Sequence, residues 1–535
     1  MTRYNNNSGN GDLHFADELW KTANKLRGSV ESAEYKHIVL GLLFLKYISD
    51  AFEERQQYLI EETHNPDNPD YYTSVESDAE FVCEDKDEYL GANIFWVPKE
   101  ARWSYLMENA TQPNLGKLID EAMLAIEREY PKYLKGLLPK IYAHSAISSH
   151  TLGEIVNLFS NIGFGTKDAI AKDVLGRTYE YFIKMFAKAE GHRGGEFYTP
   201  KCVVRLIVEI LEPYEGRIYD PACGSGGMFV QSLKFIQAHN GNGRRISIYG
   251  QELNEATWRI CKMNLAIRGL EGNIALGNTF FDDRHRDLRA DYILTNPPFN
   301  MKEWGADRVV GDVRLKYGRP PNSNANYMWI QHFIHHLSPN GMAGFVMANG
   351  SMSVGGVEGE IRQKIIEGDL VDCIVACPPQ LFFTTQIPVC LWFVTKDKVD
   401  KHCRNRQGEI LFIDARKLFV KISRIQNDFT DEHIAKIAGT YHAWRGEKEE
   451  DGYKDISGFC KSITLDDIRS HGYVLTPGRY VGTEEVEDDG EPFEEKMNRL
   501  IIQLAEQFKE SGDLQKKIRT NLKELGFNID FNDTD

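Results

Sequence analysis

A tetrapeptide in the second half of the chain has the side chains needed to hold an aromatic amine. Asn296, Pro297, Pro298 and Phe299 follow the apolar run 291–295. Two prolines end a strand and fix an extended turn. The Asn296 carboxamide oxygen and the Pro297 carbonyl can accept both hydrogens of a planar amino group, with Phe299 as a flat apolar surface beside them. The motif predicts recognition of a ring that bears an NH₂; a proline-stopped strand end with a core phenylalanine is the alternative.

A glycine-rich turn, Asp220–Gly227, lies between a predicted strand and a helical pattern that begins near 228. Gly224, Gly226 and Gly227, which flank Ser225, allow a tight turn and a close approach of the backbone to a ligand. The N-terminus of the following helix offers free N–H groups to a polar or anionic group. Taken alone, the turn is equally compatible with a plain strand–helix connection.

Acidic side chains at two further strand ends favour a nucleoside ligand. Glu252 ends the second predicted strand, where a carboxylate can accept both hydroxyls of a ribose. No lysine of a triphosphate-binding loop follows the glycine-rich turn, so a nucleoside without a triphosphate fits better. Asp282 or Asp283, after 277–279, could bind the edge of the base; a solvated loop acid is an equally good interpretation.

The segment 195–200 precedes a predicted helix over 203–211. Thr199 suits the N-cap and Pro200 the first helical position. This helix N-terminus could also face the carboxylate of a ligand, with Phe197 against an apolar part of it.

Other reactive residue types have plainer interpretations. Cys223 is interpreted as a small buried residue rather than a nucleophile. Cys373 and Cys377 lack the second pair that a zinc site needs. The histidines of the helical pattern around 333 have no carboxylate at ligand spacing and are interpreted as structural; they are His332, His335 and His336. We therefore predict no metal site.

The elements that must position these motifs form an α/β fold. Short apolar runs alternate with helical patterns from about residue 166, with strands predicted at 217–219, 246–250, 292–294, 344–347, 371–375 and 390–395. This alternation predicts a doubly wound, mostly parallel sheet, with ligands at the carboxyl ends of its strands. All the motifs above fall at such ends.

Three regions are expected. Residues 1–165 form an N-terminal helical domain, with helices predicted around 19–30, 38–47 and 118–134, and residues 166–480 form the sheet domain. Residues 481–535 form an acidic linker and a C-terminal helical tail. Its apolar stripe runs from Phe493 to Leu525 with a break at Ser511–Gly512. Such stripes are more often core, but this one follows an acidic linker at the chain end, which favours a partner.

The charge of the chain is unevenly distributed. The 535 residues contain 79 acids and 63 Lys or Arg, for a net charge of −16. Segments 61–88 and 484–495 carry −10 and −8, which leaves +2 for the rest, and both segments are interpreted as solvated loops. A neutral or basic groove is therefore compatible with the acidic total. Neither a signal peptide nor an apolar run of roughly eighteen residues is found, which predicts a soluble cytoplasmic protein.

The motifs together resemble a known family. The turn Asp220–Gly227, the Asn296–Phe299 tetrapeptide and the position of 196–200 before both resemble γ-arranged amino-DNA methyltransferases. The segments 19–28, 34–37 and 45–50 resemble more specifically the methylation (M) subunit of type I restriction–modification systems, over about residues 13–480.

This resemblance implies a cofactor, a substrate and partners. S-adenosyl-L-methionine would contact Glu196, Phe197, Tyr198, Thr199, Pro200, Lys201, Asp220, Gly224, Ser225, Gly226, Gly227, Glu252 and Asp282. A flipped adenine of double-stranded DNA would lie against Asn296–Phe299, and its N6 amino group would attack the methyl group without prior deprotonation. The family reads sequence through a specificity (S) subunit, two M to one S, and adds a restriction (R) subunit, in the cytoplasm of bacteria or archaea.

Three other interpretations stay open. A stand-alone amino-DNA methyltransferase would methylate DNA as the pure chain. A methyltransferase of another amide or amine typically carries Tyr in place of Phe299 and is much shorter. A non-catalytic scaffold that binds S-adenosylmethionine is disfavoured by the intact Asn296–Phe299 motif.

Overall fold

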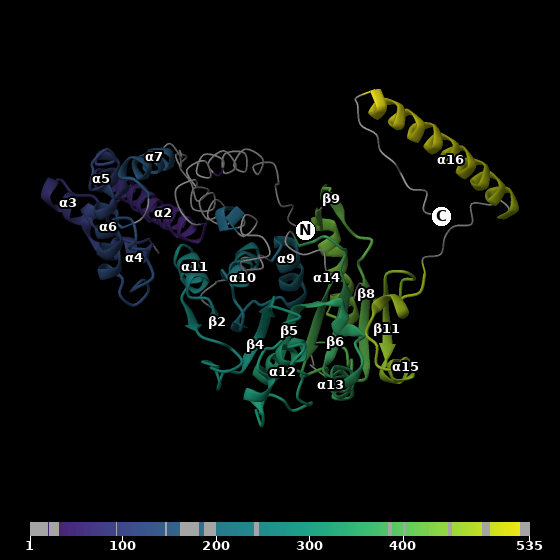
Figure 1. The fold of residues 1–535 in the computed structure, drawn as a ribbon. Helices are drawn as coiled ribbons and strands as arrows, with labels where there is room; N and C mark the ends of the chain where they lie inside the picture. The colour runs from purple at the N-terminus through teal and green to yellow at the C-terminus, as the bar shows by residue number, and fades with distance from the viewer. Residues whose placement is uncertain are drawn as a thin grey trace. The chain divides into compact units, whose positions relative to one another are not determined.

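The computed structural model divides the chain into two compact units, 1–482 and 483–535 (Figure 1). It describes residues 20, 32–92, 94–144, 147–160, 181–183, 185–186, 199–239, 245–382, 388–399, 403–424, 426–447, 452–483 and 493–524. Within this part of the chain, no helix is both long and apolar enough to cross a membrane.

The N-terminal region is helical, as predicted. Its core surrounds the long helix α2 (Ser32–Thr63), whose central turns are almost entirely apolar and buried. Around it lie α3 (Glu76–Glu84), α4 (Lys86–Gly91), α5 (Trp103–Glu108), α6 (Leu115–Glu129) and α7 (Ser149–Ser160). The helix predicted at 19–30 lies outside the described residues, apart from Trp20, which is buried.

The acidic segment 61–88 is a loop only over residues 64–75, so the expectation of a loop throughout was wrong. The rest contains the end of α2, all of α3 and the first half of α4. These helices expose most of their acidic side chains and bury single apolar positions such as Ala79, Cys83 and Tyr89. Solvated carboxylates and a helical backbone coexist because only one side of each short helix has to be apolar. The second acidic run lies largely outside the described residues.

A nine-stranded sheet forms the centre of the following region, in the order β11-β8-β6-β7-β5-β4-β1-β2-β3. Strands β7 and β11 run antiparallel to their neighbours, and all other pairs are parallel. The predicted doubly wound, mostly parallel sheet is thus confirmed. Its bounds are β1 Gly216–Asp220, β2 Ile246–Glu252, β3 Gly272–Leu276, β4 Ala290–Thr295, β5 Leu337–Ala348, β6 Val371–Ala376, β7 Val389–Thr395, β8 Glu409–Asp414 and β11 Cys460–Thr464.

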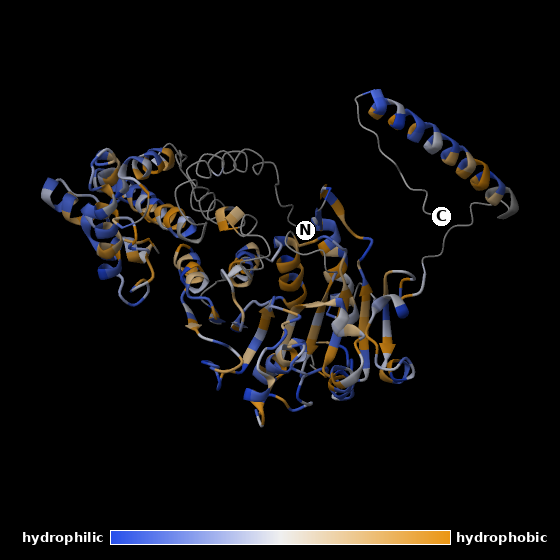
Figure 2. Cartoon of the chain, in the orientation of Figure 1, coloured by the Kyte–Doolittle hydropathy of each residue, from blue (hydrophilic) through white to orange (hydrophobic). Residues whose placement is uncertain are grey.

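Helices cover both faces of this sheet, and Figure 2 shows its strands as largely apolar. Alternate side chains of β5 enter two different cores: Met342 and Val346 pack on one face, and Phe345 and Met347 on the other. The first face is covered by α9 (Lys201–Leu211), α10 (Gly227–Ala238), α11 (Glu255–Ala266) and α14 (Asp431–Arg445). The second is covered by α12 (Asn326–His336), α13 (Gly356–Glu367) and α15 (Leu465–Ser470). A two-stranded hairpin, β9 (Val420–Ser423) and β10 (Gln426–Asp428), precedes α14.

One helix of the sheet region also belongs to the N-terminal core. Ile260 and Met263 of α11, with Ile267 just after it, pack with the buried side chains of the N-terminal helices. The Tyr47 hydroxyl donates a hydrogen bond to the Ile267 carbonyl at 2.7 Å. This contact buries the outer face of α11 and joins the first helices to the sheet.

The second compact unit contains α16 (Phe493–Glu524), a single helix of 32 residues. The predicted break at Ser511–Gly512 is wrong, because the helix continues through both residues. One glycine costs a helix only about 1 kcal/mol relative to alanine, which the good helix formers around it offset. Its larger apolar side chains are exposed by between 45% and 70%: Leu500, Ile501, Ile502, Leu504, Phe508, Leu514 and Ile518, with Met497 at 46%.

Candidate functional site

The motifs meet where the order of the strands reverses. From β1 the chain moves to β2 and β3 on one side, and then returns to β4 on the other side of β1. The carboxyl ends of β1 and β4 therefore diverge into different connections and leave space between them, the usual place for a ligand in an open α/β sheet. Asp220 ends β1 and Asn296 directly follows β4, so both sequence motifs begin at this point.

A pocket lies at this switch point. Predicted residues line it from three motifs: Thr199 and Lys201 from the helix start, Asp220, Gly224, Ser225 and Gly227 from the turn, and Asn296. The remaining lining residues were not predicted as ligand contacts: Ile183, Val204, Ala222, Cys223, Met228, Val230, Gln231 and Asn264. Most of these belong to the helices behind the motifs, where only the folded chain reveals which side faces a cavity.

The glycines of the turn leave room for a ligand. Gly224 and Gly226 have φ values of 54° and 81°, which residues other than glycine rarely adopt. A Cβ atom built on Gly224 or Gly227 would meet no protein atom within 4 Å, whereas one on Gly226 would lie 3.0 Å from Cys261 Sγ. Gly226 thus serves close packing, while Gly224 and Gly227 form an open cradle that a bound molecule can approach.

Glu252 holds the glycine-rich turn from the neighbouring strand. Its carboxylate accepts hydrogen bonds from the backbone N–H groups of Gly224 at 3.0 Å and Asn254 at 2.8 Å. Glu252 is partly exposed at the end of β2 and is not among the residues that line the pocket. A carboxylate has about four acceptor positions, so these bonds leave capacity for ribose hydroxyls.

Asp220 is a fully buried acid at the pocket wall. Its Oδ1 accepts hydrogen bonds from the Thr295 hydroxyl at 2.6 Å and from the Ala222 N–H at 3.1 Å. Burial raises the pKa of Asp220 to about 7, although these two bonds act in the opposite direction. The Thr295 bond also joins the ends of β1 and β4, which fixes the distance between the two motifs.

The two polar atoms of the Asn296 side-chain amide differ in their hydrogen bonding. Its Nδ2 donates to the Thr199 hydroxyl at 3.0 Å, whereas its Oδ1 is buried and has no hydrogen-bond partner among the described residues. A buried acceptor without a partner costs about 1–3 kcal/mol, so its retention at a pocket suggests that a ligand donor satisfies it. The Thr199 bond sets the orientation of the amide and directs the oxygen rather than the NH₂ group to this position.

Thr199 has a different role from the one predicted. The helix begins at Lys201, its N-cap is Pro200, and no side chain caps it. The expectation that Thr199 caps the helix and that Pro200 is its first residue was therefore wrong. The Thr199 hydroxyl accepts from Asn296, 97 residues away, and is not used for local capping. Glu196, Phe197 and Tyr198 lie outside the described residues.

Asp282 lies apart from the pocket. It pairs with Arg284 at 2.6 Å, and it lines a separate surface hollow with Arg217, Tyr249 and the segment 283–288. Its backbone carbonyl accepts from the Gln251 side chain at 2.8 Å. Of the described residues predicted to bind a cofactor, Asp282 is thus the one that the structure places in another hollow.

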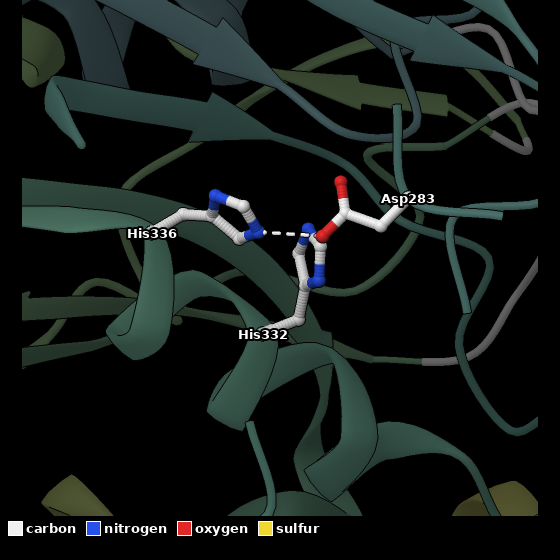
Figure 3. Close-up of side chains that lie close together, drawn as sticks. All are labelled: Asp283, His332 and His336. Atoms are coloured by element: carbon white, nitrogen blue, oxygen red, sulfur yellow. Dashed lines mark hydrogen bonds and ion pairs between the residues drawn. The ribbon is translucent and has the colours of Figure 1, made fainter. Parts of the chain in front are cut away.

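Asp283 forms part of a buried network with two histidines (Figure 3). His336 Nε2 lies 2.9 Å from Asp283 Oδ2, so the expectation that these histidines have no carboxylate partner was wrong. His336 Nδ1 contacts the Leu288 carbonyl, and His332 contacts the Tyr219 hydroxyl and the Arg314 guanidinium. Because each ring nitrogen has a hydrogen-bonding partner and a buried cation lies beside them, the cluster suits a structural network better than a metal ion.

Two members of this network have shifted pKa values. Burial alone would raise the pKa of Asp283, but the hydrogen bond from His336 and the nearby Arg314 lower it overall. Burial lowers the pKa of His332 well below its ordinary value, which keeps that ring neutral. The network therefore joins the loop after β3 to α12 below the pocket.

Cys223 is buried, and its sulfur lies 3.9 Å from Cys261 Sγ. The hydrogen bond to Cys261 and burial raise the pKa of Cys223 well above its ordinary value. A thiol held in its neutral form is a poor nucleophile, in agreement with its interpretation as a small buried residue.

The comparisons with known proteins agree with this architecture. The family described as N-6 DNA methylase matches residues 170–489, and the HsdM N-terminal domain matches 15–159. The chain therefore belongs to the N-6 DNA methylase family, a class of enzymes that the sheet and its motifs also define.

Within this class, the chain belongs to the methylase subunits of type I restriction enzymes. It is 47% identical over 519 residues to the MjaIX methylase subunit of Methanocaldococcus jannaschii, covering 96% of this chain and 92% of that protein. It is 48% identical over 454 residues to the HindI methylase subunit of Haemophilus influenzae, covering 81% and 100%. A solved methyltransferase subunit from Streptococcus thermophilus shares the fold, with a TM-score of 0.71 at 24% identity, covering 88% of this chain and 99% of that one. The predicted family is thus confirmed.

Proposed function

We propose that this chain transfers a methyl group from S-adenosyl-L-methionine to the exocyclic N6 amino group of an adenine extruded from double-stranded DNA. The observation that carries the proposal is the buried Oδ1 atom of Asn296, which has no hydrogen-bond partner in the described part of the chain and belongs to a residue that lines the pocket at the glycine-rich turn. Membership of the methylase family supports the same reaction.

The pocket residues fit the cofactor. The open cradle at Gly224 and Gly227 admits a close approach, and the start of α10 offers backbone N–H groups. Lys201 and Thr199 line the opposite wall. Glu252 would accept from the ribose hydroxyls, and Asp220, with the turn it begins, would hold the cofactor from below. When bound, S-adenosylmethionine supplies an electrophilic methyl group on a sulfonium sulfur.

The chain's own residues then prepare the amine. Asn296 Oδ1 and the Pro297 carbonyl would accept hydrogen bonds from the two amino hydrogens, which withdraws the nitrogen lone pair from the ring and makes it available for an in-line attack on the methyl group. The N–C bond would form as the S–C bond breaks, S-adenosyl-L-homocysteine would leave, and the methylated amine would lose one proton to solvent. Phe299, partly buried beside them, supports the face of the base. No covalent intermediate with the protein is required, so the rate depends on positioning and electrostatics. Extrusion of the base costs a few kcal/mol, which contacts with the pocket offset.

The rest of the chain would serve assembly. We propose that residues 1–165, 166–480 and 481–535 act as an N-terminal helical domain, the methyltransferase domain and an assembly tail. The tail would dock on a helix of a specificity subunit that reads the DNA sequence. The exposed apolar side chains of α16 support this function. Two such chains for each specificity subunit, joined by a restriction subunit in the cytoplasm of a bacterium or archaeon, would form the full complex.

The experiment that tests the reaction separates chemistry from cofactor binding. Asn296→Ala removes the unpartnered acceptor, so kcat for N6-methyladenine formation should fall at least about 100-fold while the affinity for S-adenosylmethionine stays close to wild type. Methylation is measured by mass spectrometry of DNA treated with the full chain and its specificity subunit.

A second pocket asparagine provides the matched control. Asn264 Nδ2 donates to the Ser225 carbonyl at 2.8 Å and so supports the glycine-rich turn rather than the amine site. Asn264→Ala should weaken cofactor binding with a smaller effect on kcat at saturation. Near wild-type methylation by the Asn296→Ala complex would refute the proposed reaction, and methylation by the pure wild-type chain would show a stand-alone enzyme.

A further inference from the structure

We infer that Trp329 and Asn326, on the first turn of α12, are positioning residues that set the geometry of the loop 296–300 for methyl transfer. This inference rests on the proposed function, because it concerns where the loop presents its acceptors to the amine. Both side chains act through the backbone of the loop and are not placed in contact with the substrate.

After the motif, the chain forms a long loop whose two ends are hydrogen-bonded to each other. It leaves the motif at Met301 and returns at Ala325, where the Ala325 N–H donates to the Met301 carbonyl at 3.1 Å. One step further out, the Glu303 N–H donates to the Asn322 carbonyl at 2.8 Å. These bonds bring the first turn of α12 directly beside the motif loop.

Asn326 fixes the end of the loop through a reciprocal pair of hydrogen bonds. Its Oδ1 accepts from the Asn300 N–H at 2.7 Å, and its Nδ2 donates to Asn300 Oδ1 at 3.0 Å. Asn300 has a φ of 59°, a left-handed conformation that asparagine tolerates better than most residues. Asn326 is only 2% exposed, whereas Asn300 is exposed, so the two bonds are shielded from water on the Asn326 side.

Trp329 fixes the second proline of the motif. Its Nε1–H donates to the Pro298 carbonyl at 3.1 Å, and its ring packs on Phe280 and stacks with Phe333. The proline ring already restricts φ of Pro298. The bond to the Pro298 carbonyl oxygen therefore constrains ψ, the remaining backbone dihedral of this residue.

The loop is therefore held at both ends. Thr199 orients Asn296 at one end, and Asn326 and Trp329 hold Asn300 and Pro298 at the other. The Pro297 carbonyl and the Phe299 ring lie between these anchors. A shift of about 1 Å in a reacting group can cost about 100-fold in rate, so the anchors would act on kcat rather than on binding.

The chain contains a matched control for Trp329. Trp304 is similarly buried, belongs to the same hydrophobic core and also packs against Phe280. Its Nε1–H also donates to a proline carbonyl, that of Pro321, at 2.9 Å. Tryptophan to phenylalanine at either position removes one such bond and keeps an aromatic ring. The two variants should therefore have similar melting temperatures, and only the variant at Trp329 should change the geometry of the motif loop.

The experiment compares Trp329→Phe with Trp304→Phe in the full chain assembled with its specificity subunit. Trp329→Phe should lower kcat for adenine methylation by about 10- to 100-fold, with the KM for DNA and the affinity for S-adenosylmethionine within about 2-fold of wild type. Trp304→Phe should keep kcat within about 2-fold. Equal kcat values for the two variants, or a Trp329→Phe effect on KM alone, would overturn the inference.

A second pair of variants tests Asn326. Asn326→Ala removes both bonds, whereas Asn326→Asp keeps an oxygen acceptor for the Asn300 N–H, so Asn326→Asp should restore part of the lost kcat. An Asn326→Asp rate no higher than that of Asn326→Ala would contradict the role of this acceptor. The two failures can be told apart. If the proposed function is wrong, the Asn296→Ala complex will still methylate DNA. If only this inference is wrong, the Asn296→Ala complex will be inactive.

Discussion

At the carboxyl edge of the sheet, polar side chains bond to one another around the pocket, whereas the apolar side chains of α16 are about half exposed. Thr295 donates a hydrogen bond to Asp220 across the ends of β4 and β1, and the adjacent Asn296 donates one to Thr199, just before α9. On α16, Leu504 and Phe508 remain 50% and 70% exposed. Among the described pocket side chains, Asn296 keeps one acceptor without a partner, whereas α16 exposes an apolar surface of the kind that a protein partner can cover.

The two regions therefore differ in the kind of molecule that each would bind. Under the proposed function, the pocket would take a polar hydrogen-bond donor at a single atom, Asn296 Oδ1. The helix requires an extended apolar surface, which is defined by a stripe along its length. Changes at the pocket should therefore affect chemistry and cofactor binding, and changes on α16 should affect assembly.

Removal of α16 should give the largest effect after Asn296→Ala. Truncation after Gly490 should leave a folded chain that binds S-adenosylmethionine but no longer co-purifies with the specificity subunit, because the apolar stripe is lost. Calorimetry and pull-down measure the two properties. Melting of the whole truncated chain would show that the stripe belongs to its own core, and normal assembly would place the contact elsewhere. As a finer control, Leu504→Gln should weaken assembly more than Glu506→Gln, which lies on the opposite side of the helix.

Substitution of Glu252 should have an intermediate effect on the cofactor. Glu252→Ala should weaken S-adenosylmethionine binding by about 1–3 kcal/mol, because it removes ribose acceptors and also releases the Gly224 N–H. Glu252→Gln keeps one oxygen acceptor and should cost less. Isothermal titration of the full chain measures both affinities, and an unchanged affinity for Glu252→Ala would remove this residue from the site.

Asp220 should make a smaller, pH-dependent contribution to stability. Its pKa is raised to about 7 in the folded chain, against an ordinary value of 3.8. Between about pH 4 and pH 7 the unfolded chain releases this proton while the folded chain retains it, so stability falls as the pH rises through this window. Asp220→Asn abolishes the titration and keeps an acceptor for Thr295.

The Tm of Asp220→Asn relative to wild type should therefore rise from pH 5 to pH 8, by an amount equivalent to about 1–3 kcal/mol. Scanning fluorimetry across this range measures it. A difference in Tm that stays constant with pH would contradict the raised pKa of Asp220.

Much of the site was predictable because its motifs are local. Proline pairs, glycine turns and acids at strand ends place Asn296, Gly224 and Glu252 at one edge of a parallel sheet wherever such a sheet forms. The same local reasoning missed β3 and β11, since these strands lack an unambiguous apolar run and depend on their neighbours for pairing. It also missed β8, although this strand contains the apolar run Ile410–Ile413.

The sequence alone determined the α/β class, the strand ends that carry the motifs and the amphipathic character of α16, because these follow from short-range periodicity and residue type. The family was indicated by the resemblance of the motifs. Only the tertiary structure decided that Thr199 orients Asn296, that Trp329 contacts Pro298, that Asp283 meets His336 and that Asp282 lies in another hollow. These pairings join segments between 31 and 97 residues apart. Hydrogen bonds at such separations depend on how the helices and loops pack, and local propensity does not encode that packing.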